Sequence, residues 1–334
     1  MRKGTGNGMT PFIQGVSPTD PDLDFLRSLP EFPIRSPFGH KGTYGTSVLI
    51  GGSRGMSGSI SLAGRAALVA GSGLVRLLIP DRILETVAAL TPEYTMIPLL
   101  NDDAGKISFQ AREEIETELL TASAVGLGPG LGRSPELNVL VPELFFETAA
   151  PMVLDADALN ALSATLFQQA SDSPPNAQER RPKGIRVLTP HPGEFARMTG
   201  IKPPVDTAGR QTAARQFILK YQTLFPGSGS CSVPPLFLVL KGHETIITDG
   251  RELFVNKTGN PGMGTAGSGD VLTGILTALL AQKLAPMTAV RLAVALHGLA
   301  GDCAASVLPM ESITATDLIR FFPAALAYFR SLFR

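Results

Sequence analysis

A glycine-rich loop that runs directly into a helix is the stretch of this sequence best suited to chemistry. The segment Gly259–Asp270 contains five glycines and one proline and ends on an aspartate. The residues after it have the apolar spacing of one helical face: Val271, Leu272, Ile275, Leu276, Leu279 and Leu280. Free N–H groups and the positive end of a helix dipole bind anions, and glycines let the backbone approach phosphate oxygens closely. The segment therefore predicts a phosphate site with Asp270 beside it.

Asp270 is the reactive group of this segment. No Lys-Ser/Thr pair follows the glycines, so the segment is not a P-loop. A carboxylate at the tip of a helix should stay ionised near neutral pH, and it could accept a proton from a substrate hydroxyl beside the bound phosphate. The alternative is that Asp270 only caps the helix, although a cap alone does not call for so many glycines.

Other polar or glycine-rich loops follow predicted strands. They are Gly51–Gly58, Gly126–Gly132, Asp155–Asn160, Thr189–Glu194 and Lys241–Thr245. Loops that follow the strands of a parallel sheet converge on one edge, where such sheets bind their ligands. We therefore expect these loops to form a single site for a nucleotide and a second substrate.

Two of these loops have more than one interpretation. Asp155, Asp157 and Asn160 could hold a metal, hold a ribose, or cap the next helix, because Asp and Asn are both good caps. Lys241-Gly242 offers a cation and open backbone to a phosphate or a ribose, or it is a plain surface turn. The sequence leaves these alternatives open.

Two histidines differ in their surroundings. A lone histidine is more often structural than functional, but His191 is held between two prolines after a predicted strand, which favours a ligand contact. A catalytic role for His191 is possible but not demanded. His297 lies among leucines and valines, so we expect it to be a packing residue.

The elements that position these loops alternate between strand and helix. The expected strands lie near residues 47–50, 74–80, 94–100, 122–127, 152–155, 186–188 and 236–240, followed by a hairpin over 246–255 with an Asp249-Gly250 turn. The expected helices cover 59–72, 81–89, 111–120, 211–221, 271–280, 286–307 and 316–333. The alternation predicts an α/β fold with a doubly wound, mostly parallel central sheet and helices on both faces.

The chain is expected to form one domain over residues 32–334. Residues 1–31 are predicted to be a loosely ordered tail with one short helical turn near Leu23–Leu29, and order should begin near Ile34. Two polar segments, Gln168–Lys183 and Pro226–Pro235, are expected to be surface insertions.

Composition excludes several classes of function. The 334 residues carry 29 basic and 29 acidic side chains, so no basic excess indicates nucleic acid and no charge asymmetry indicates a membrane surface. Charged residues interrupt every long apolar stretch, so no membrane span is expected. The two cysteines, Cys231 and Cys303, form no Cys-x-x-Cys motif and fit a reducing compartment. These features predict a cytoplasmic soluble enzyme.

The motifs together resemble a known family. The Gly-Ser-Gly-Asp junction at residues 267–270 resembles the anion hole and base of the ribokinase-like superfamily. The longer string Asn260–Gly274 is similar to the NAD(P)H-hydrate dehydratases, which repair hydrated nicotinamide cofactors. Matching loops occur in order from residue 34 to residue 329: His40-Lys-Gly with Tyr44-Gly, Gly51–Gly58, Gly126–Gly132, Leu154–Asn160, Leu188–Phe195 and Leu240-Lys-Gly.

This resemblance implies a ribokinase-like fold and an activity. Such enzymes use ADP or ATP, with Mg²⁺, to dehydrate the S epimer of hydrated NADH or NADPH. It implies that the hydrated nicotinamide contacts Ser59, Gly130, His191 and Asp270. It implies that the nucleotide contacts Lys241, Gly242, His243, Glu244, Thr245, Asn260, Gly267, Ser268 and Gly269. A homo-oligomer, in the family a homotetramer, and an NAD(P)H-hydrate epimerase as functional partner are also implied, whereas the metal ligands are left unknown.

This chain departs from the family pattern at a few positions. The family commonly has Ala where this chain has Ser59, and its Met-Ala-Thr-Gly-Gly-Ser-Gly-Asp is here Met263-Gly-Thr-Ala-Gly-Ser-Gly-Asp270. Ala266 would be a difficulty only if its position needed a positive φ.

One alternative to the dehydratase function is a kinase of the same superfamily acting on a hydroxymethylpyrimidine, a thiazole or a sugar alcohol. A non-catalytic nucleotide-binding protein is another, but such a protein gains little from Asp270.

Overall fold

One nine-stranded sheet organises the chain. The structure, a computed structural model, describes residues 15–164, 181–224 and 236–334. The strands are β1 (Thr46–Ile50), β2 (Leu74–Pro80), β3 (Thr95–Leu99), β4 (Ala124–Leu127), β5 (Met152–Leu154), β6 (Arg186–Leu188), β7 (Leu236–Leu240), β8 (Ile246–Thr248) and β9 (Leu253–Val255). Their order is β3-β2-β1-β4-β5-β6-β7-β8-β9. All pairings up to β7 are parallel, and β8 and β9 extend the sheet with antiparallel pairings, so that β9 forms the edge.

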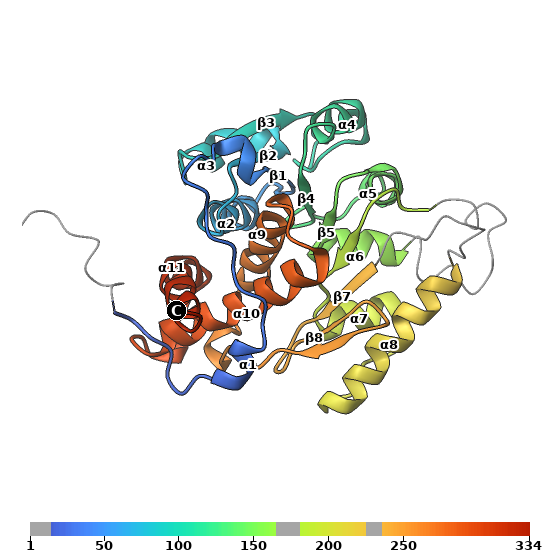
Figure 1. The fold of residues 1–334 in the computed structure, drawn as a ribbon. Helices are drawn as coiled ribbons and strands as arrows, with labels where there is room; N and C mark the ends of the chain where they lie inside the picture. The colour runs from blue at the N-terminus through green and yellow to red at the C-terminus, as the bar shows by residue number, and fades with distance from the viewer. Residues whose placement is uncertain (1–14, 165–180, 225–235) are drawn as a thin grey trace, which may run out of the picture.

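Helices cover both faces of this sheet (Figure 1). One layer consists of α2 (Ser57–Val69), α9 (Ser268–Ala281), α10 (Pro286–Ala305) and α11 (Ala315–Ser331). The other consists of α4 (Arg112–Leu119), α5 (Leu137–Glu147), α6 (Ala156–Leu162), α7 (Pro192–Thr199) and α8 (Thr207–Leu224). The short helices α1 (Leu23–Arg27) and α3 (Leu84–Ala88) complete the set of α-helices in these ranges. The predicted doubly wound architecture is confirmed.

The sheet separates two hydrophobic cores. Leu49 of β1 faces the core under α2 and α9, whereas its neighbours Val48 and Ile50 face the core under α5. Side chains alternate across a strand, so a strand buried on both faces must be apolar at every position. This is why the central strands appear in the sequence as short continuous apolar runs.

Close packing of α9 against α2 depends on small residues. A side chain at Gly274 would place its Cβ 2.1 Å from the carbonyl oxygen of Ala63 and 2.8 Å from the Cβ of Ala66. The alanines and glycine therefore let the two helices approach closely, as the small-residue composition of α2 predicts. This contact places the N-terminus of α9 beside the loop that precedes α2.

The structure corrects two sequence-based expectations. Residues 15–31 were expected to be loose, but α1 buries Leu26 completely and Leu29 is only 5% exposed. Leu26 and Leu29 belong to the core that includes α10 and α11, and Arg291 of α10 donates to the carbonyl of Ser28 over 3.3 Å. Two apolar residues are too few to show a clear period in the sequence. Helix α5 was not predicted, because it is apolar on most of its surface and contains Pro142.

Some predictions fall outside the described residues. Residues 168–180 of the first predicted insertion, and the whole of the second, 226–235, are positions that the structure does not describe. Cys231 belongs to the same group, whereas Cys303 is a buried free thiol. Within the described ranges, no helix combines the length and the apolar character that crossing a bilayer requires.

Candidate active site

Loops after β1 and β4 meet where the strand order reverses. The chain leaves β1 in one direction toward β2 and β3, and the later strands extend in the other direction. The Gly52 N–H donates to the carbonyl of Pro129 over 2.8 Å, and the Ser53 hydroxyl donates to the carbonyl of Gly130 over 2.9 Å. Sheets of this kind bind ligands at such a switch point.

Three of the four residues predicted to bind the second substrate lie together there. Gly130 has a φ of 62°, and a Cβ on it would lie 2.9 Å from the Cβ of Ser59. The Ser59 side chain, in the first turn of α2, lies close enough to the carboxylate of Asp270 to act on its pKa. The structure therefore brings Ser59, Gly130 and Asp270 to one place from three distant parts of the sequence.

Asp270 is not the cap of α9. The N-cap is Gly267, which has a φ of 87° and no side-chain capping bond, and Asp270 lies within the first turn. The interpretation of Asp270 as a cap is therefore wrong. Ala266 is absent from the residues with positive φ, so the exchange of small residues in this loop causes no strain.

A cavity of about 610 Å³ lies on the other flank of the α9 N-terminus. Its lining includes most of the predicted nucleotide residues, Lys241, Gly242, His243, Glu244, Thr245, Asn260, Ser268 and Gly269, together with His191. Gly267, Ser59, Gly130 and Asp270 are not part of the lining. The first turn of α9 thus separates a large cavity from the cluster around Asp270.

Lys241 lies between carboxylates under this turn. Its Nζ is 2.7 Å from Oδ1 of Asp155 and 3.9 Å from Oε2 of Glu194. A Cβ on Gly269 would lie 3.1 Å from the same Nζ, so a side chain at this position would crowd the ammonium group. Burial alone would lower the pKa of Lys241, but the carboxylates of Asp155 and Glu194 raise it above its usual value. Lys241 is therefore a permanent cation directly beneath the glycine-rich turn, and the interpretation as a plain surface turn is wrong.

The polar side chains of the loop after β5 form hydrogen bonds and an ion pair with other groups of the protein. Asp155 makes no side-chain capping bond; instead it pairs with Lys241 and accepts a hydrogen bond from Thr273 over 3.0 Å. The Asp157 carboxylate accepts a hydrogen bond from the N–H of Gly132 over 2.9 Å. The side-chain oxygen of Asn160 accepts one from Nε of Arg197 over 2.8 Å. Asp155 thus occupies the N-cap position of α6, but its side chain pairs elsewhere and does not cap the helix. In the ranges that the structure describes, no group of three possible metal ligands occurs.

The surroundings of Asp270 raise the pKa of its carboxyl group. Burial raises the pKa of Asp270 to about 6, and the neighbouring Asp155 carboxylate acts in the same direction, against the Ser59 hydroxyl and the Lys241 cation. The group is still mostly ionised at pH 7, as the sequence predicts, and it is more basic than an ordinary aspartate. A base with a pKa near the working pH transfers protons well in both directions.

This raised pKa has a consequence for stability. A raised carboxyl pKa stabilises the fold when the group is protonated, and that contribution is lost as the pH rises from its ordinary pKa of 3.8 through about 6. Asp270→Asn mimics the protonated form, so it should raise the free energy of unfolding at neutral pH by about 2 kcal/mol. The gain should shrink toward zero as the pH approaches about 4. Denaturant unfolding across this pH range, with the exposed Asp103→Asn as control, checks the prediction; a destabilised Asp270→Asn at neutral pH would contradict it.

His191 is positioned to donate a hydrogen bond and not to act as a base. Its Nδ1 accepts the N–H groups of Gly193 and Glu194 over 3.0 and 3.3 Å and so caps α7. Burial, together with Lys241 and Arg197, lowers the pKa of His191, so the ring is neutral and Nε2 carries its proton. Half of the side chain is exposed, and the residue lines the cavity. The predicted ligand contact therefore stays available, and the possible catalytic role as a base is not supported by this geometry.

Two residues of the site were not recognised in the sequence. His297, expected to be a packing residue, is 8% exposed but lines the cavity, with Nε2 3.5 Å from Oγ of Ser268. Burial lowers the pKa of His297 to about 4, so the ring is neutral. Asp302 accepts the Gly259 N–H over 2.8 Å and the Asn260 side-chain amide over 3.0 Å. Both lie on α10, and only contact with a distant loop reveals them.

Gly267 offers a direct test of the glycine-rich turn. A Cβ on Gly267 would lie 2.6 Å from Leu62 Cδ1 and 3.0 Å from Ala315 Cβ, at a φ of +87°. Gly267→Ala should therefore lower the free energy of unfolding by about 1–3 kcal/mol. Gly58→Ala is the matched control, because nothing lies within 4 Å of its added Cβ. Equal stability of the two variants in denaturant unfolding would contradict the strain at Gly267.

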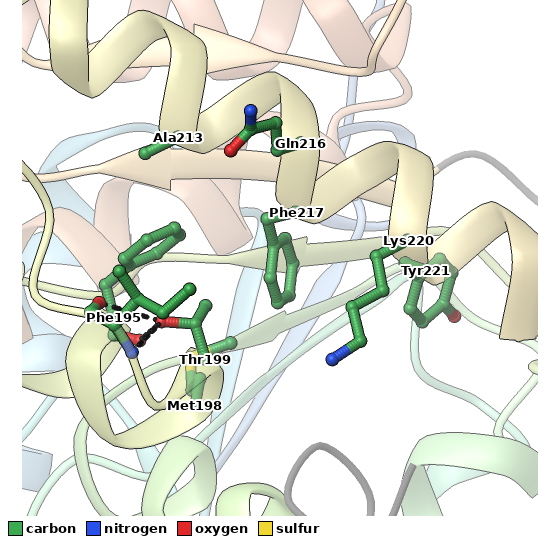
Figure 2. A pocket seen from close by; sticks show the side chains of 9 residues that line it. Phe195, Met198, Thr199, Ala213, Gln216, Phe217, Lys220 and Tyr221 are labelled. Atoms are coloured by element: carbon green, nitrogen blue, oxygen red, sulfur yellow. Dashed lines mark hydrogen bonds between the residues drawn. The ribbon is translucent and has the colours of Figure 1, made fainter. Parts of the chain in front are cut away.

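Other features lie away from this site. The turn at His40–Gly45 packs against the far end of α9, because a Cβ on Gly45 would lie 2.0 Å from the carbonyl oxygen of Ala281. A second, apolar cavity of about 230 Å³ lies between α7 and α8 (Figure 2). It is lined by side chains such as Phe195, Met198 and Phe217 and includes none of the glycine-rich loops. Neither feature contributes to the candidate site.

Comparison with known proteins agrees with this geometry. A family model described as NAD(P)H-hydrate dehydratase matches residues 47–324. The chain is 39% identical over 298 residues to the bifunctional NAD(P)H-hydrate repair enzyme of Moorella thermoacetica, covering 89% of this chain and 52% of that protein. It is 37% identical over 273 residues to the ADP-dependent (S)-NAD(P)H-hydrate dehydratase of Neisseria meningitidis, covering 81% of each. The chain thus spans about half the length of the bifunctional relatives that it matches.

A solved structure supports the same assignment. The ADP/ATP-dependent NAD(P)H-hydrate dehydratase from Bacillus subtilis, co-crystallised with ATP and Mg²⁺, is 27% identical, with a TM-score of 0.69 over 92% of this chain and 97% of that one. The ribokinase-like fold implied by the motifs is confirmed by such neighbours. The glycine-rich turn with its aspartate, the cavity beside it and the family match together place this chain in the NAD(P)H-hydrate dehydratase family.

Proposed function

We propose that this protein uses ADP or ATP to dehydrate the S epimer of hydrated NADH or NADPH. The observation that carries the proposal is the position of Asp270 beside Ser59 and Gly130, on one flank of an α9 N-terminus whose other flank lines the large cavity. This arrangement supports a nucleotide in the cavity and a hydroxyl-bearing substrate near Asp270. The terminal phosphate would lie between them, against the N–H groups of Gly267, Ser268 and Gly269.

The chemistry follows from this placement. Hydroxide is a poor leaving group and phosphate is a good one, so the hydroxyl must first be phosphorylated. Asp270 takes the hydroxyl proton, the substrate oxygen forms a bond to the β-phosphorus of ADP, and the bond from that phosphorus to AMP breaks. Phosphate then leaves with the electrons of its C–O bond, and loss of a ring proton restores the double bond. Hydrate plus ADP gives NAD(P)H, AMP and phosphate, so the atoms balance.

The surrounding charges fit each step. Lys241 lies beneath Gly269 and counters negative charge that builds up on the transferred phosphoryl group. The Nε2–H of His191 can donate to the nucleotide or to the substrate amide. Asp270 returns to its carboxylate form when its proton passes to the departing phosphate, and its pKa of about 6 suits both transfers.

Mg²⁺ fits this site as a partner of the nucleotide. Mg²⁺ usually binds through one or two carboxylates and the phosphates of its substrate, and it neutralises their charge. Asp155 is engaged by Lys241 and Thr273. Glu194 accepts the backbone N–H of His191 over 2.8 Å and lies 3.9 Å from Nζ of Lys241. The carboxylates of the described residues near the cavity are thus already paired, so the phosphates of the nucleotide would supply the main ligands of the ion.

Product analysis tests the function. The protein is incubated with hydrated NADH and with ADP or ATP in turn, and the recovery of reduced nicotinamide absorbance is followed. We expect AMP and phosphate to form from ADP in equal amounts with NADH. A persistent phosphate ester in the mass spectrum would instead establish a small-molecule kinase of this superfamily, the second candidate. Nucleotide binding without any turnover would establish a non-catalytic binding protein.

The remaining family features are proposed on the same basis. We propose a cytoplasmic location, a homo-oligomer, and cooperation with an NAD(P)H-hydrate epimerase that converts the R epimer. The bifunctional relatives are named as repair enzymes, and this chain covers about half of their length. Their second half would supply a second repair activity, which supports an epimerase as partner of this protein. A preference for ADP is supported by the Neisseria meningitidis relative, which is named as ADP-dependent.

A further inference from the structure

Arg210 is a buried cation directly behind the loop that lines the large cavity. It belongs to the first turn of α8, and only 5% of its surface is exposed. Its Nη2 donates to the carbonyl oxygen of His243 and, over 3.2 Å, to that of Glu244. A Cβ on Gly242 would lie 2.6 Å from its Nη1. One guanidinium group therefore contacts three consecutive residues of the loop 241–245.

The loop needs such a support. Gly242 has a φ of +145° and Glu244, which is not a glycine, has a φ of +54°. A non-glycine residue with a positive φ costs energy and persists only where its surroundings hold it. Two carbonyls on the far side of the loop accept hydrogen bonds from Arg210, which turns the rest of the loop toward the cavity.

A second contact from the same helix holds the Glu244 side chain. The Thr207 hydroxyl donates to Oε2 of Glu244, and Nζ of Lys257 donates to Oε1 over 2.5 Å. These bonds lower the pKa of Glu244 to about 2, the Lys257 bond having the larger effect. The carboxylate is thus fixed as an anion that points back toward Lys257 and Thr207. Arg210 thus holds the backbone of the loop 241–245, and Thr207 holds the side chain of Glu244.

The charge of Arg210 is not neutralised nearby. Within the ranges that the structure describes, its bonds go to backbone carbonyls, its Nε has no acceptor, and no carboxylate lies within ion-pair distance. A buried cation without a counter-ion costs stability, so packing alone is a poor reason for it. An anionic ligand in the cavity would be attracted by this charge, which the low dielectric of its surroundings screens only weakly.

We infer that Arg210 is a positioning residue for the nucleotide: it shapes the loop 241–245 and adds positive charge behind it, without touching the reacting atoms. This inference rests on the proposed function, because it assumes that the cavity holds a nucleoside diphosphate or triphosphate. It assigns to α8, a helix that carries none of the predicted site residues, control of nucleotide affinity. The hydrated substrate, on the other flank of α9, should be unaffected by it.

The test compares three variants for their separate effects on the two substrates. Arg210→Met removes the charge and the donors, and should raise the KM and Kd for ADP about ten- to hundredfold. Arg210→Lys keeps the positive charge but lacks the planar guanidinium group with its several donors, so it should raise the KM and Kd for ADP by less. Thr207→Val removes only the side-chain contact and should raise the KM for ADP several-fold. For each variant, kcat at saturating ADP and the KM for the hydrate should stay within about threefold of wild type.

Controls separate the possible outcomes. Arg215→Met, on an exposed position of the same helix, should leave every constant unchanged. Thermal unfolding identifies any Arg210 variant that does not fold, and Thr207→Val then decides, since it leaves the core intact. An unchanged Kd for ADP in folded variants, or a loss confined to kcat, overturns the inference. Absence of ADP binding to the wild-type protein overturns both the inference and the proposed function, whereas ADP binding with kinase chemistry overturns the proposed function alone.

Discussion

Asp270→Asn is expected to lower kcat by about a thousandfold while the Kd for ADP stays within about threefold of wild type. Asparagine keeps the shape of the side chain, but it cannot accept the hydroxyl proton. The nucleotide cavity lies on the other flank of α9 and does not include Asp270 among its lining residues. The rate is measured from the recovery of reduced nicotinamide, and the Kd from calorimetric titration with ADP.

Two comparisons make this result specific. Asp103→Asn, on an exposed position of the same protein, should retain full activity. In the wild-type enzyme, the rate should fall as the pH drops through about 6, because protonated Asp270 cannot act as a base. An Asp270→Asn enzyme with most of its rate, or one that lost ADP affinity to the same extent as activity, would show that Asp270 is not the general base.

Asp155→Ala is expected to reduce the free energy of unfolding by about 3–5 kcal/mol. Asp155 is 1% exposed, and its removal leaves the Lys241 ammonium group buried without the partner that it contacts over 2.7 Å. Breaking one side of a buried ion pair is costly because the remaining charge must stay desolvated. The same change withdraws the acceptor of the Thr273 hydroxyl inside α9. Denaturant unfolding at neutral pH measures the loss.

A double variant distinguishes the ion pair from simple loss of packing. In Asp155→Ala/Lys241→Met neither member of this ion pair is left without the other, so the double variant should be more stable than the sum of the two single changes predicts. Glu116→Ala is the control for an exposed pair: its carboxylate is 2.8 Å from Arg112, both side chains are more than a third exposed, and the loss should be below about 1 kcal/mol. Additive single effects would rule out the proposed coupling.

The loops of the site were predictable because the sequence pattern of each one lies within a short stretch of the chain. A strand, a glycine-rich loop and a helix follow one another within a short stretch, and their apolar spacing shows the change of period at once. This is why β1, β4, β7 and the start of α9 agree with the predicted elements to within a few residues. Helix α5 was missed for the opposite reason, since a helix that is buried on most sides has no polar face to reveal its period.

The roles of individual carboxylates depended on distant contacts. Asp155, Asp157 and Asn160 fit a cap, a ribose or a metal equally well as a sequence, and only their partners separate these possibilities. Asp155 turned out to pair with Lys241, 86 residues further along the chain. His297 and Arg210 lie in ordinary helical patterns, and their positions beside the cavity or its loop follow from packing of helices against the sheet.

By itself, then, the order of residues determined the family, the doubly wound sheet and the aspartate at the head of α9, because each follows from patterns only a few residues long. Tertiary structure decided which charges meet: Lys241 with Asp155, Asp270 with Ser59, and Arg210 with the back of the loop 241–245. The physical reason is that burial and Coulomb interaction depend on separation in space. The raised pKa of Asp270 arises in this way from groups that the chain brings together from several strands and helices.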